Sequence, residues 1–470
     1  MWTRRASIRT FLGLVGVSTF PAALRAKLPI FTPERFGAKG DGRTDDSDAF
    51  AALSDAINAS GGGRIMLRRT TYLVGTVGAD LAVRRLLAIR GCTHPVRIEG
   101  NGAILRCAPG QRFGAFTQDL QPIEGRPRKG DGRRLMRPYA AMVLVENCSG
   151  SLTIENLELD GTSGALVLGG RHGDTGWQIG CWGLGLRNNS GSERVVNVHA
   201  HDQAQDGFYI DGVDSDAVGF RRELIKLRSS RNARQGLSLV GGRDYTISDS
   251  VFEQTGRNRF GSAPAAGVDI EAQQRKQIRR IDFKNCRFVD NRGCGLVADS
   301  GDSADLRFLR CSFVGTSDWS AWARKPGMVF EKCLFVGSIV HGFSDPDPRR
   351  ATRFTDCTFT NDPALSPTGI VRLRKNLIAD LPRAQNVLFE RCRFDLHGSG
   401  VLPWSVGPIW KDCTMSQESK QVAHTRGTFR GTNRITGPVA IAHSRIEGPL
   451  YLNGVLLKRS TGASLSDTAV

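Results

Sequence analysis

The chain has 470 residues, and its 40% of hydrophobic residues suffices for a folded core, which excludes a disordered chain. Its apolar runs are all shorter than about 18 residues, so we expect no transmembrane helix and no membrane partner. The formal net charge of +18 favours an acidic binding partner over a basic one.

Residues 1–26 have the composition of an export signal. Arg4 and Arg5 lie in a basic segment, residues 11–23 form a short apolar run, and Ala26 provides a small residue for cleavage. This run is too short to anchor the chain in a bilayer. The pair of arginines is typical of the twin-arginine export route, so the sequence predicts a periplasmic or secreted protein.

The positive charge then indicates the class of polymer that the protein meets. The sequence contains no recognisable DNA- or RNA-binding motif, and an exported protein meets little nucleic acid, so we expect no nucleic-acid partner. A polysaccharide with uronates or other acidic substituents fits both the charge and the compartment. We therefore expect an acidic polysaccharide as the partner.

Residues 27–75 are predicted to form an N-terminal capping segment. Within it, residues 45–59 have the pattern of a helix. Asp45, Asp46 and Asp48 favour the N-terminal end of its dipole, and alanines and larger apolar residues make one face. A repetitive fold needs such a cap, because its first repeat would otherwise expose its core.

A six-residue pattern, Phe-x-x-Cys-x-Phe, recurs through the C-terminal half of the chain. Its copies begin at Phe283, Phe308, Phe330, Phe354 and Phe389, with a degenerate copy at Trp410. Looser copies begin at Ile154, Val195, Leu224 and Ile247. The spacings from Phe283 onward are 25, 22, 24, 35 and 21 residues, a period that is typical of solenoid proteins.

Residue parity within the pattern predicts the shape of each repeat. Side chains alternate faces along a strand, so the Cys and the last Phe share one face while the first Phe points away from it. All three can face one core only if the chain bends between them. Asn156, Asn197, Asn285 and Asp356 stand at the bend, and these residue types tolerate turns. The repeats therefore predict an all-β chain wound as a right-handed parallel β-helix.

The cysteines of the pattern are then predicted to stack in the core as free thiols. The total of eleven is odd, and no pair has the CxxC spacing of a zinc site. The coils are expected to cover residues 76–458, with loop excursions near residues 109–138, 257–264 and 361–376. Residues 459–470 are expected to form a flexible tail.

The segment FTPERFGAKGDGRTDDSDAFAALSDAINASGGGRIMLRRTTYLVG, residues 31–75, resembles the N-terminus of the pectate-lyase-like superfamily. That superfamily includes rhamnogalacturonases, epimerase-like β-helices and phage tailspikes. The likeness implies the same parallel β-helix and a polysaccharide substrate. The resemblance does not choose an activity, because the superfamily contains lyases, hydrolases, epimerases and proteins without catalytic activity.

A second strand in each repeat, often opened by Gly, carries the predicted site. Alignment of DGFYID, QGLSLV, AGVDIE and CGLVAD places apolar side chains inward and a row of polar side chains outward on adjacent coils. The outward row comprises Tyr209, Asp211, Ser238, Asp269, Glu271 and Asp299. Carboxylates this close repel one another, so either one is protonated near neutral pH or a cation binds between them. The expected cation is Ca²⁺, held by Asp211, Glu271 and Asp299, and no other cofactor is expected.

Basic, aromatic and imidazole side chains are predicted to surround these acids. The residues expected to bind substrate are Trp177, His199, His201, Tyr209, Arg257 and Arg259. Those expected to be catalytic are Asp206, Asp211, Arg234, Asp269 and Glu271.

Two reactions and one binding role fit this set, and we expect β-elimination first. The pectate lyases that the chain resembles use an Arg as base, and Arg234 could act so here. Hydrolysis is the alternative, in which two carboxylates would act as acid and base or as acid and nucleophile. Asp206 in QDG resembles the first acid of the polygalacturonase motif NTDG, but Gln235 and Gly236 replace that family's paired Asp, and no GHG or RIK motif follows. A non-catalytic carbohydrate-binding β-helix is the third alternative, which the density of acids disfavours.

Overall fold

The computed structural model describes residues 28–75, 86–124, 133–173, 176–213, 220–315, 319–337, 339–373 and 384–457. The predicted export signal and C-terminal tail lie outside these residues, as do parts of the predicted excursions at 109–138 and 361–376. Within the described parts, no helix is both long enough and apolar enough to cross a membrane.

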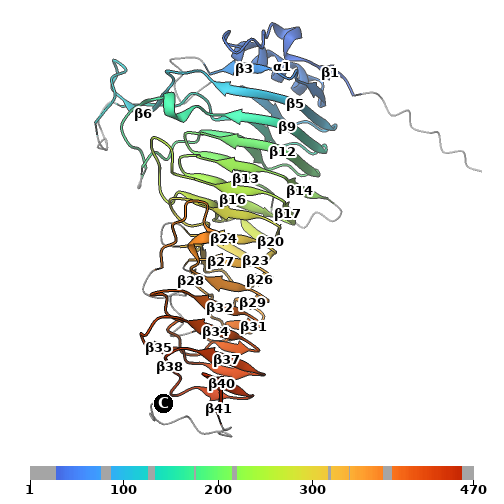
Figure 1. Ribbon diagram of the computed structural model, residues 1–470. Coiled ribbons are helices and arrows are strands. Elements are labelled where there is room, and N and C mark those ends of the chain that lie inside the picture. Colours follow the sequence, from blue (N-terminus) through green and yellow to red (C-terminus); the bar gives the residue numbers. More distant parts are fainter. Residues whose placement is uncertain are drawn as a thin grey trace, which may run out of the picture.

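Parallel strands stack in three ladders and wind the chain into a parallel β-helix, which confirms the predicted fold (Figure 1). The first ladder contains β2 (Gly63–Met66), the first halves of β5 (Val96–Cys107), β9 (Leu152–Asp160) and β12 (Glu193–His201), β14 (Arg222–Ile225), β17 (Tyr245–Ser248), β20 (Gln277–Lys284), β23 (Asp302–Leu309), β26 (Val329–Glu331), β29 (Arg353–Thr355), β31 (Leu388–Glu390), β33 (Ile409–Lys411), β36 (Thr428–Arg430) and β39 (Arg445–Ile446). Strand β1 (Ile30–Phe31) pairs with β2.

The second ladder follows the bend in each coil. It contains β3 (Thr71–Val74), the second halves of β5, β9 and β12, β15 (Arg228–Ser230), β18 (Val251–Glu253), β21 (Arg287–Val289), β24 (Ser312–Val314), β27 (Leu334–Val336), β30 (Thr358–Thr360), β32 (Arg393–Leu396), β34 (Thr414–Gln417), β37 (Asn433–Thr436) and β40 (Leu450–Leu452). Strand β41 (Val455–Leu457) returns antiparallel to β40.

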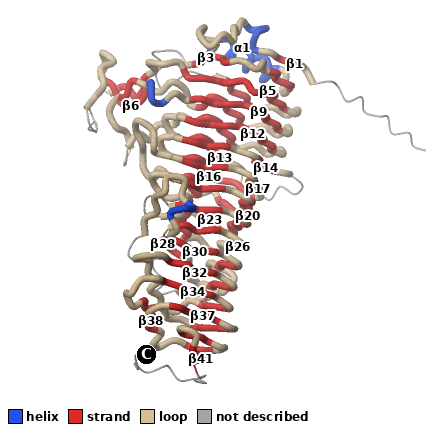
Figure 2. Tube along the Cα trace, in the orientation of Figure 1, coloured by secondary structure: helices blue, strands red, loops and turns tan. Residues whose placement is uncertain are grey.

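The third ladder covers only the upper part of the solenoid among the described residues. It contains β4 (Leu87–Arg90), β8 (Ala141–Glu146), β11 (Trp182–Arg187), β13 (Asp206–Asp211), β16 (Gln235–Arg243), β19 (Ala266–Ile270), β22 (Leu296–Ala298), β25 (Ala321–Ala323) and β28 (Ile339–His341). Smaller pieces lie outside the ladders: β6 (Arg112–Phe116), β7 (Arg134–Met136) and β10 (Val167–Leu168) form a side sheet, and β35 (Ala423–His424) pairs with β38 (Val439–Ala440). Figure 2 shows β6 projecting from the side of the coils.

The bend between the first and second ladders is a left-handed residue, as parity predicts. Asn156, Asn197, Asn285 and Asp356 have φ angles of 57°, 53°, 55° and 53°. Other coils place Lys226, Arg310, Lys332 and Arg391 at the same position, also with positive φ. A left-handed residue other than Gly costs about 1–2 kcal/mol. Closure of the coil around its core therefore imposes the bend even where the residue type does not favour it.

Stacked aromatic rings and buried thiols fill the core. The first Phe of each pattern copy stacks on the next, with ring centroids of Phe283, Phe308, Phe330 and Phe354 separated by 4.9, 4.8 and 5.0 Å. Each fully buried Phe contributes about 1.5–3 kcal/mol. All eleven cysteines are buried and free, which confirms the predicted thiols.

Helix α1 (Ser47–Ala59) covers the first coils and confirms the predicted cap (Figure 1). Phe50 and Ile57 on its inner face are fully buried. Ser54 and Asn58 bond to the backbone of β4 at distances of 2.9–3.0 Å, which ties the helix to the third ladder. The core at this end is therefore closed from solvent.

Candidate functional site

The outward row of the third ladder has the register that the sequence predicts. Tyr209 pairs with Ser238, Ser238 with Asp269, and Asp269 with Val297 on successive coils. The neighbouring inward positions, from Phe208 onward, are buried in the core. Strand alternation therefore places these polar side chains together on the outer face.

A cavity of about 400 Å³ lies over this row. Its charged lining is contributed by Arg234, Asp269, Glu271 and Asp299, and Trp319 and Trp322 supply its aromatic lining. Ala263 and Pro264 also line it, and they come from the loop between β18 and β19, which the sequence predicted as an excursion. The cavity thus joins carboxylates, a guanidinium and aromatic rings, a combination suited to binding a sugar chain.

Asp269 is the most strongly perturbed acid in this cavity. Its side chain is nearly buried and accepts a 2.6 Å hydrogen bond from Nε2 of Gln235. Burial raises the pKa of Asp269 to about 7, and the charges of Glu271 and Asp206 add to the rise while Arg234 opposes it. A carboxyl with this pKa can donate or accept a proton at neutral pH.

Arg234 lies between two acids on the wall of the cavity. Its Nη1 is 3.4 Å from Oδ2 of Asp206, and 15% of its side chain is exposed. Burial acts to lower the pKa of Arg234, but the carboxylates of Asp206 and Asp269 outweigh it and raise the pKa. Within the described part of the chain, Nε of Arg234 is buried and has no hydrogen-bond acceptor. The guanidinium is therefore a permanent cation in the wall of the cavity.

Asp206, predicted to be catalytic, lies beneath the cavity rather than in its wall. It is fully buried and accepts a 3.0 Å hydrogen bond from Oγ of Ser238. Burial raises the pKa of Asp206 to about 6, with Arg234 opposing the shift. This carboxylate is closed to solvent and contacts Arg234 from beneath the cavity.

Glu271 and Asp299 lie at the open side of the cavity. Oγ of Ser300 donates a 2.9 Å hydrogen bond to Oε1 of Glu271, and Asp299 is exposed. Both acids follow paired strands, β19 and β22, so they lie on adjacent coils as the alignment predicts. Besides Asp269, the cavity thus holds the partly exposed carboxylate of Glu271.

Asp211 does not join these acids as the sequence predicted. Its Oδ1 is 2.5 Å from Nζ of Lys276, and its Oδ2 is 3.7 Å from Nε of Arg187. The register also shifts between Ile210 and Asp211, which displaces Asp211 along the ladder. An ion pair with Lys276 therefore replaces the expected contact with other carboxylates.

The three predicted Ca²⁺ ligands do not form one group, because Asp211 lies apart from Glu271 and Asp299. Among the described residues, two groups of three ligand atoms lie within 4.8 Å of one another: Glu158 with His199 and His201, and Asp160 with His201 and Asp202. Neither group includes Asp211, Glu271 or Asp299.

Tyr209, predicted to bind substrate, forms an aromatic surface with Trp182, which the sequence analysis missed. The two rings stack with centroids 3.8 Å apart and an angle of 3° between them. Gly185 leaves room for the indole, because a Cβ there would lie 3.3 Å from it. Nε1 of Trp182 donates to Gln205, which fixes the ring. Burial raises the pKa of Tyr209 to about 12.

Trp319 and Trp322, also missed, lie on the other side of the acids. Their ring centroids are 5.4 Å apart, and both pack against the outer side of the third ladder around Val297. The only available sequence signal was their spacing in WSAW. Trp319 lies in a loop, to which the coil pattern assigns no position, whereas Trp322 lies on β25 in register with Val297.

Trp177 lines a second cavity of about 340 Å³ beside the first. Ala263, Pro264 and Gly293 line both cavities, so the two adjoin. The guanidinium of Arg171 lies 5.5 Å from the ring centroid of Trp177. Trp177 therefore lies in the cavity next to the one that holds the acids, and not in the same cavity.

Arg257 and Arg259, expected to bind substrate, instead contact neighbouring coils. Nε of Arg257 donates to the backbone and side chain of Asp290 at 2.7 and 3.0 Å. Nη1 of Arg259 donates to the carbonyls of Gly164 and Leu166. Neither lines the two cavities. They hold the loop that forms a wall of both.

His199 and His201 lie on a different ladder from Asp269, on the outer side of β12. Burial lowers the pKa of His199 to about 3, and the neighbouring His201 adds to the shift. Burial also acts to lower the pKa of His201, but hydrogen bonds and charges from Asp202 and nearby acids raise it. Neither imidazole lines the cavities over the third ladder.

No family model matches the sequence. A protein of Klebsiella phage KN3-1 described as "Depolymerase 1, capsule KN3-specific" is 25% identical over 336 residues, which cover 70% of this chain and 36% of the phage protein. Alginate lyase 7 of Azotobacter vinelandii is 44% identical over 61 residues, 13% of this chain and 7% of that protein. The chain thus spans about a third of the length of the phage protein and a much smaller part of the alginate lyase.

Solved structures with similar shape are more distant in sequence. The A-module of the mannuronan C-5 epimerase AlgE4 of Azotobacter vinelandii matches with a TM-score of 0.42 and 15% identity, covering 89% of this chain and 97% of the module. An exopolygalacturonase of Thermotoga maritima matches with a TM-score of 0.33 and 12% identity, covering 92% and 94%. The narrower resemblance of residues 31–75 to the pectate-lyase-like superfamily stays a prediction.

Proposed function

We propose that this protein cleaves an acidic polysaccharide bound along the third ladder, with Asp269 and Glu271 as the catalytic carboxylates. The observation that carries the proposal is the cavity in which a carboxyl of pKa about 7, a second carboxylate and a mostly buried cation meet beside two Trp side chains. The similarity over 336 residues to a phage capsule depolymerase supports a polysaccharide as substrate.

The aromatic side chains suit a polymer that lies parallel to the solenoid axis. Trp182 and Tyr209 lie on the coils before the acids, and Trp322 lies on β25 after them. Five coil steps separate β11 from β25, which gives a length of about 24 Å at roughly 4.8 Å per step. Several sugar units can occupy this length with their apolar faces on the rings.

Hydrolysis is the reaction that we place first. Asp269, whose pKa burial raises to about 7, can hold a proton at neutral pH and donate it to the glycosidic oxygen, while Glu271 activates water. The Cα atoms of residues two apart along a strand are about 7 Å apart. The two side chains therefore start from a spacing comparable to the roughly 6.5–9.5 Å between the carboxyl groups of inverting enzymes, which accommodates a water molecule. Arg234 then binds an acidic substituent of the sugar.

Elimination is the second candidate, and Arg234 is the observation that favours it. A buried cation could neutralise a uronate carboxylate and acidify the adjacent C–H bond. Arg234 is a poor base, however, because neighbouring carboxylates raise its pKa. In this reaction ionised Asp269 would take the proton, so both reactions depend on the same acid.

Digestion of a panel of acidic polysaccharides distinguishes the candidates. We expect new reducing ends without new absorbance at 235 nm for hydrolysis, and both signals for elimination. Asp269→Asn and Glu271→Gln should each lower turnover by about 10²–10⁴. Asp282→Asn, which removes an acid from the first ladder, is the matched control and should retain full turnover. Unchanged turnover in folded Asp269→Asn would refute the proposal.

The acidity of the substrate is tested separately by salt. If charge attracts the polymer, its binding should weaken steadily as salt rises through about 0.05–0.5 M, because the Debye length shrinks. A neutral glucan of similar length should bind weakly at every salt concentration. Binding that does not change with salt would exclude an acidic substrate while leaving cleavage itself intact.

A further inference from the structure

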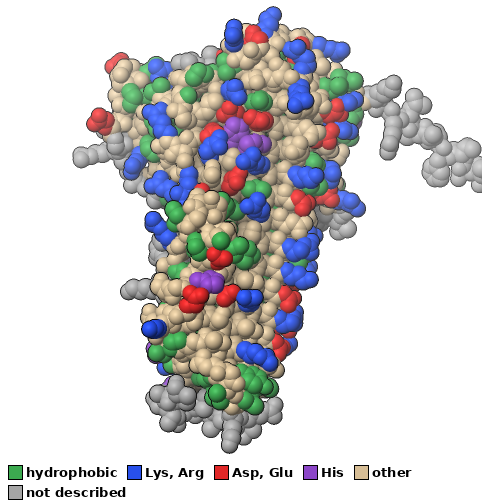
Figure 3. Space-filling model, in the orientation of Figure 1, with side chains coloured by type: hydrophobic (Ala, Val, Ile, Leu, Met, Phe, Trp, Pro, Cys, Tyr) green, Lys and Arg blue, Asp and Glu red, His purple; other side chains and the backbone are tan. Residues whose placement is uncertain are grey.

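His199 and His201 form a second polar cluster, away from the third ladder. They alternate with inward residues on β12, so both imidazoles project from the outer face of the second ladder. On the neighbouring strand β9, Glu158 pairs with His199 and Asp160 pairs with His201. Figure 3 shows this face, where His side chains lie among acidic and basic ones at the height of β9 and β12.

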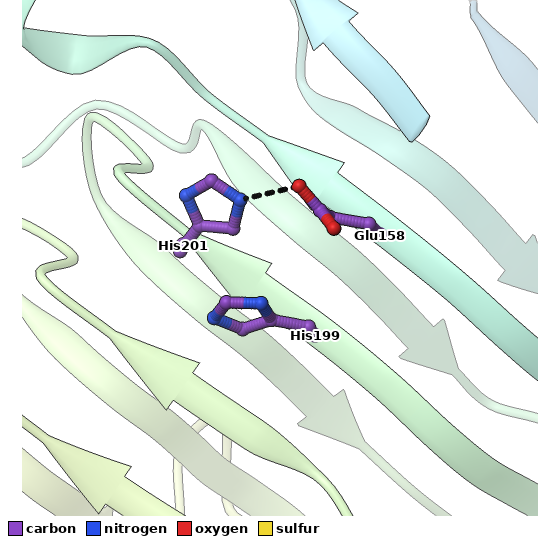
Figure 4. Close-up of side chains that lie close together, drawn as sticks. All are labelled: Glu158, His199 and His201. Carbon is purple, nitrogen blue, oxygen red and sulfur yellow. Dashed lines mark hydrogen bonds and ion pairs between the residues drawn. The ribbon is translucent and has the colours of Figure 1, made fainter. Parts of the chain in front are cut away.

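The geometry brings three ligand atoms to one point. One carboxylate oxygen of Glu158 and one ring nitrogen each of His199 and His201 lie within 4.8 Å of one another. Nε2 of His201 is 3.2 Å from Oε1 of Glu158, and the two imidazole centroids are 4.4 Å apart. Figure 4 shows the three side chains gathered on adjacent strands. Two imidazoles and one carboxylate are a common ligand set for zinc.

The opposite nitrogen of each imidazole is held by another side chain. Nδ1 of His201 is 2.7 Å from Oδ2 of Asp202, and Nε2 of His199 is 2.9 Å from Oγ of Ser230. Such contacts fix the ring orientation and tautomer of metal-binding histidines. They leave Nε2 of His201 and Nδ1 of His199 as the nitrogens available to an ion.

The other acids beside this group of three are already paired with arginines. Arg106 pairs with Asp160 at 2.9 Å and Arg231 with Asp202 at 2.5 Å, so the other nearby acids are neutralised. Glu158 contacts His201 and keeps 37% of its side chain exposed. A fourth position on an ion bound here would therefore face solvent.

We propose that Glu158, His199 and His201 bind a divalent transition-metal ion of the zinc class. Imidazole ligands select zinc, cobalt, nickel or copper over calcium, which requires oxygen ligands. This site is independent of the function proposed for the third ladder. A chain of contacts nevertheless links the two regions. Asp202, which contacts His201, accepts a 2.6 Å hydrogen bond from Nδ2 of Asn258, and Asn258 belongs to the loop that carries Ala263 and Pro264.

Cobalt binding to the untagged full chain tests the proposal without an activity assay. After removal of metals with a chelator, Co²⁺ is added and followed by its visible absorption, with Zn²⁺ added afterwards as competitor. We expect one equivalent of Co²⁺ with visible bands that Zn²⁺ removes. We expect each of the single variants His199→Gln, His201→Gln and Glu158→Gln to weaken Co²⁺ binding. The double His variant should weaken it by more than about 100-fold, because loss of a residue that only supports a metal ligand already costs up to about that much.

The matched control is His397→Ala. Nδ1 of His397 lies 3.2 Å from Oε1 of Glu418, so this variant removes a single surface His–Glu pair from another part of the solenoid. It should bind Co²⁺ as the native chain does. Circular dichroism of every variant checks the fold, and Glu158→Gln, on a partly exposed residue, keeps the test valid if a His variant fails to fold. Absence of saturable Co²⁺ binding, or equal binding by a folded double His variant, would overturn the proposal.

Discussion

Nη1 of Arg234 lies 3.4 Å from Oδ2 of Asp206. A cation in the wall of the cavity therefore forms an ion pair with a carboxylate that is buried from solvent. The same oxygen of Asp206 accepts a 3.0 Å hydrogen bond from Oγ of Ser238, which belongs to the outward row of the third ladder. Since Asp206 also helps to raise the pKa of Asp269, its charge affects the proposed proton donor without touching substrate.

Asp206→Asn should therefore move the pH profile as well as the rate. Without the Asp206 charge, the pKa of Asp269 falls, and the alkaline limb of kcat/KM shifts to lower pH. Loss of the partner that orients Arg234 should lower kcat by about tenfold to a hundredfold. A rate measured from pH 5 to 9 checks both effects. A slower variant with an unshifted limb would indicate a purely structural role for Asp206.

Trp319 and Trp322 should contribute to binding rather than to chemistry. Replacing either by Ala should raise KM for a long polysaccharide by about tenfold, the equivalent of 1.4 kcal/mol, with kcat nearly unchanged. Trp404→Ala is a suitable control, because Trp404 is 46% exposed and lies outside both cavities. A fall in kcat with constant KM would place these rings in the reaction step instead.

The raised pKa of Asp269 predicts how stability changes with pH. The folded protein holds this proton up to pH about 7, whereas the unfolded chain releases it near 3.8. The free energy of unfolding contributed by this group is therefore highest below pH 4 and falls as pH rises to 7, by roughly 3–5 kcal/mol. Denaturant titrations of native protein and Asp269→Asn at pH 4.5 and 7.5 should differ in this direction. A parallel pH dependence of the two proteins would contradict it.

The buried cysteine ladder predicts a strong dependence on side-chain polarity. Cys311 is 2% exposed, and its thiol lies 3.6 Å from the carbonyl of Phe283. Cys311→Asp should cost several kcal/mol because it buries an unpaired charge, whereas Cys311→Ala should cost about 1–2 kcal/mol. A thiol reagent should label no cysteine quickly in the native protein and all eleven after denaturation. Equal stability of both variants would disprove the inward position.

Local sequence patterns sufficed to predict the fold and part of the site. The Phe-x-x-Cys-x-Phe repeat demands a bend, and the bend at Asn285 is where parity requires it. Alternation along each strand also put Asp269 on the outer face in register with Ser238. These features depend on neighbours within one coil and on the stacking of similar coils, so they can be read from the chain.

The tertiary structure decided everything that depends on loops and corners. No periodic pattern indicates that Trp319 lines the cavity or that Arg259 turns away to the carbonyl of Gly164. The burial of Asp206 follows from the start of its strand at a corner, and the pairing of Asp211 with Lys276 follows from a local register shift. Such contacts join residues far apart in sequence, and their geometry is set by long-range packing rather than by strand alternation.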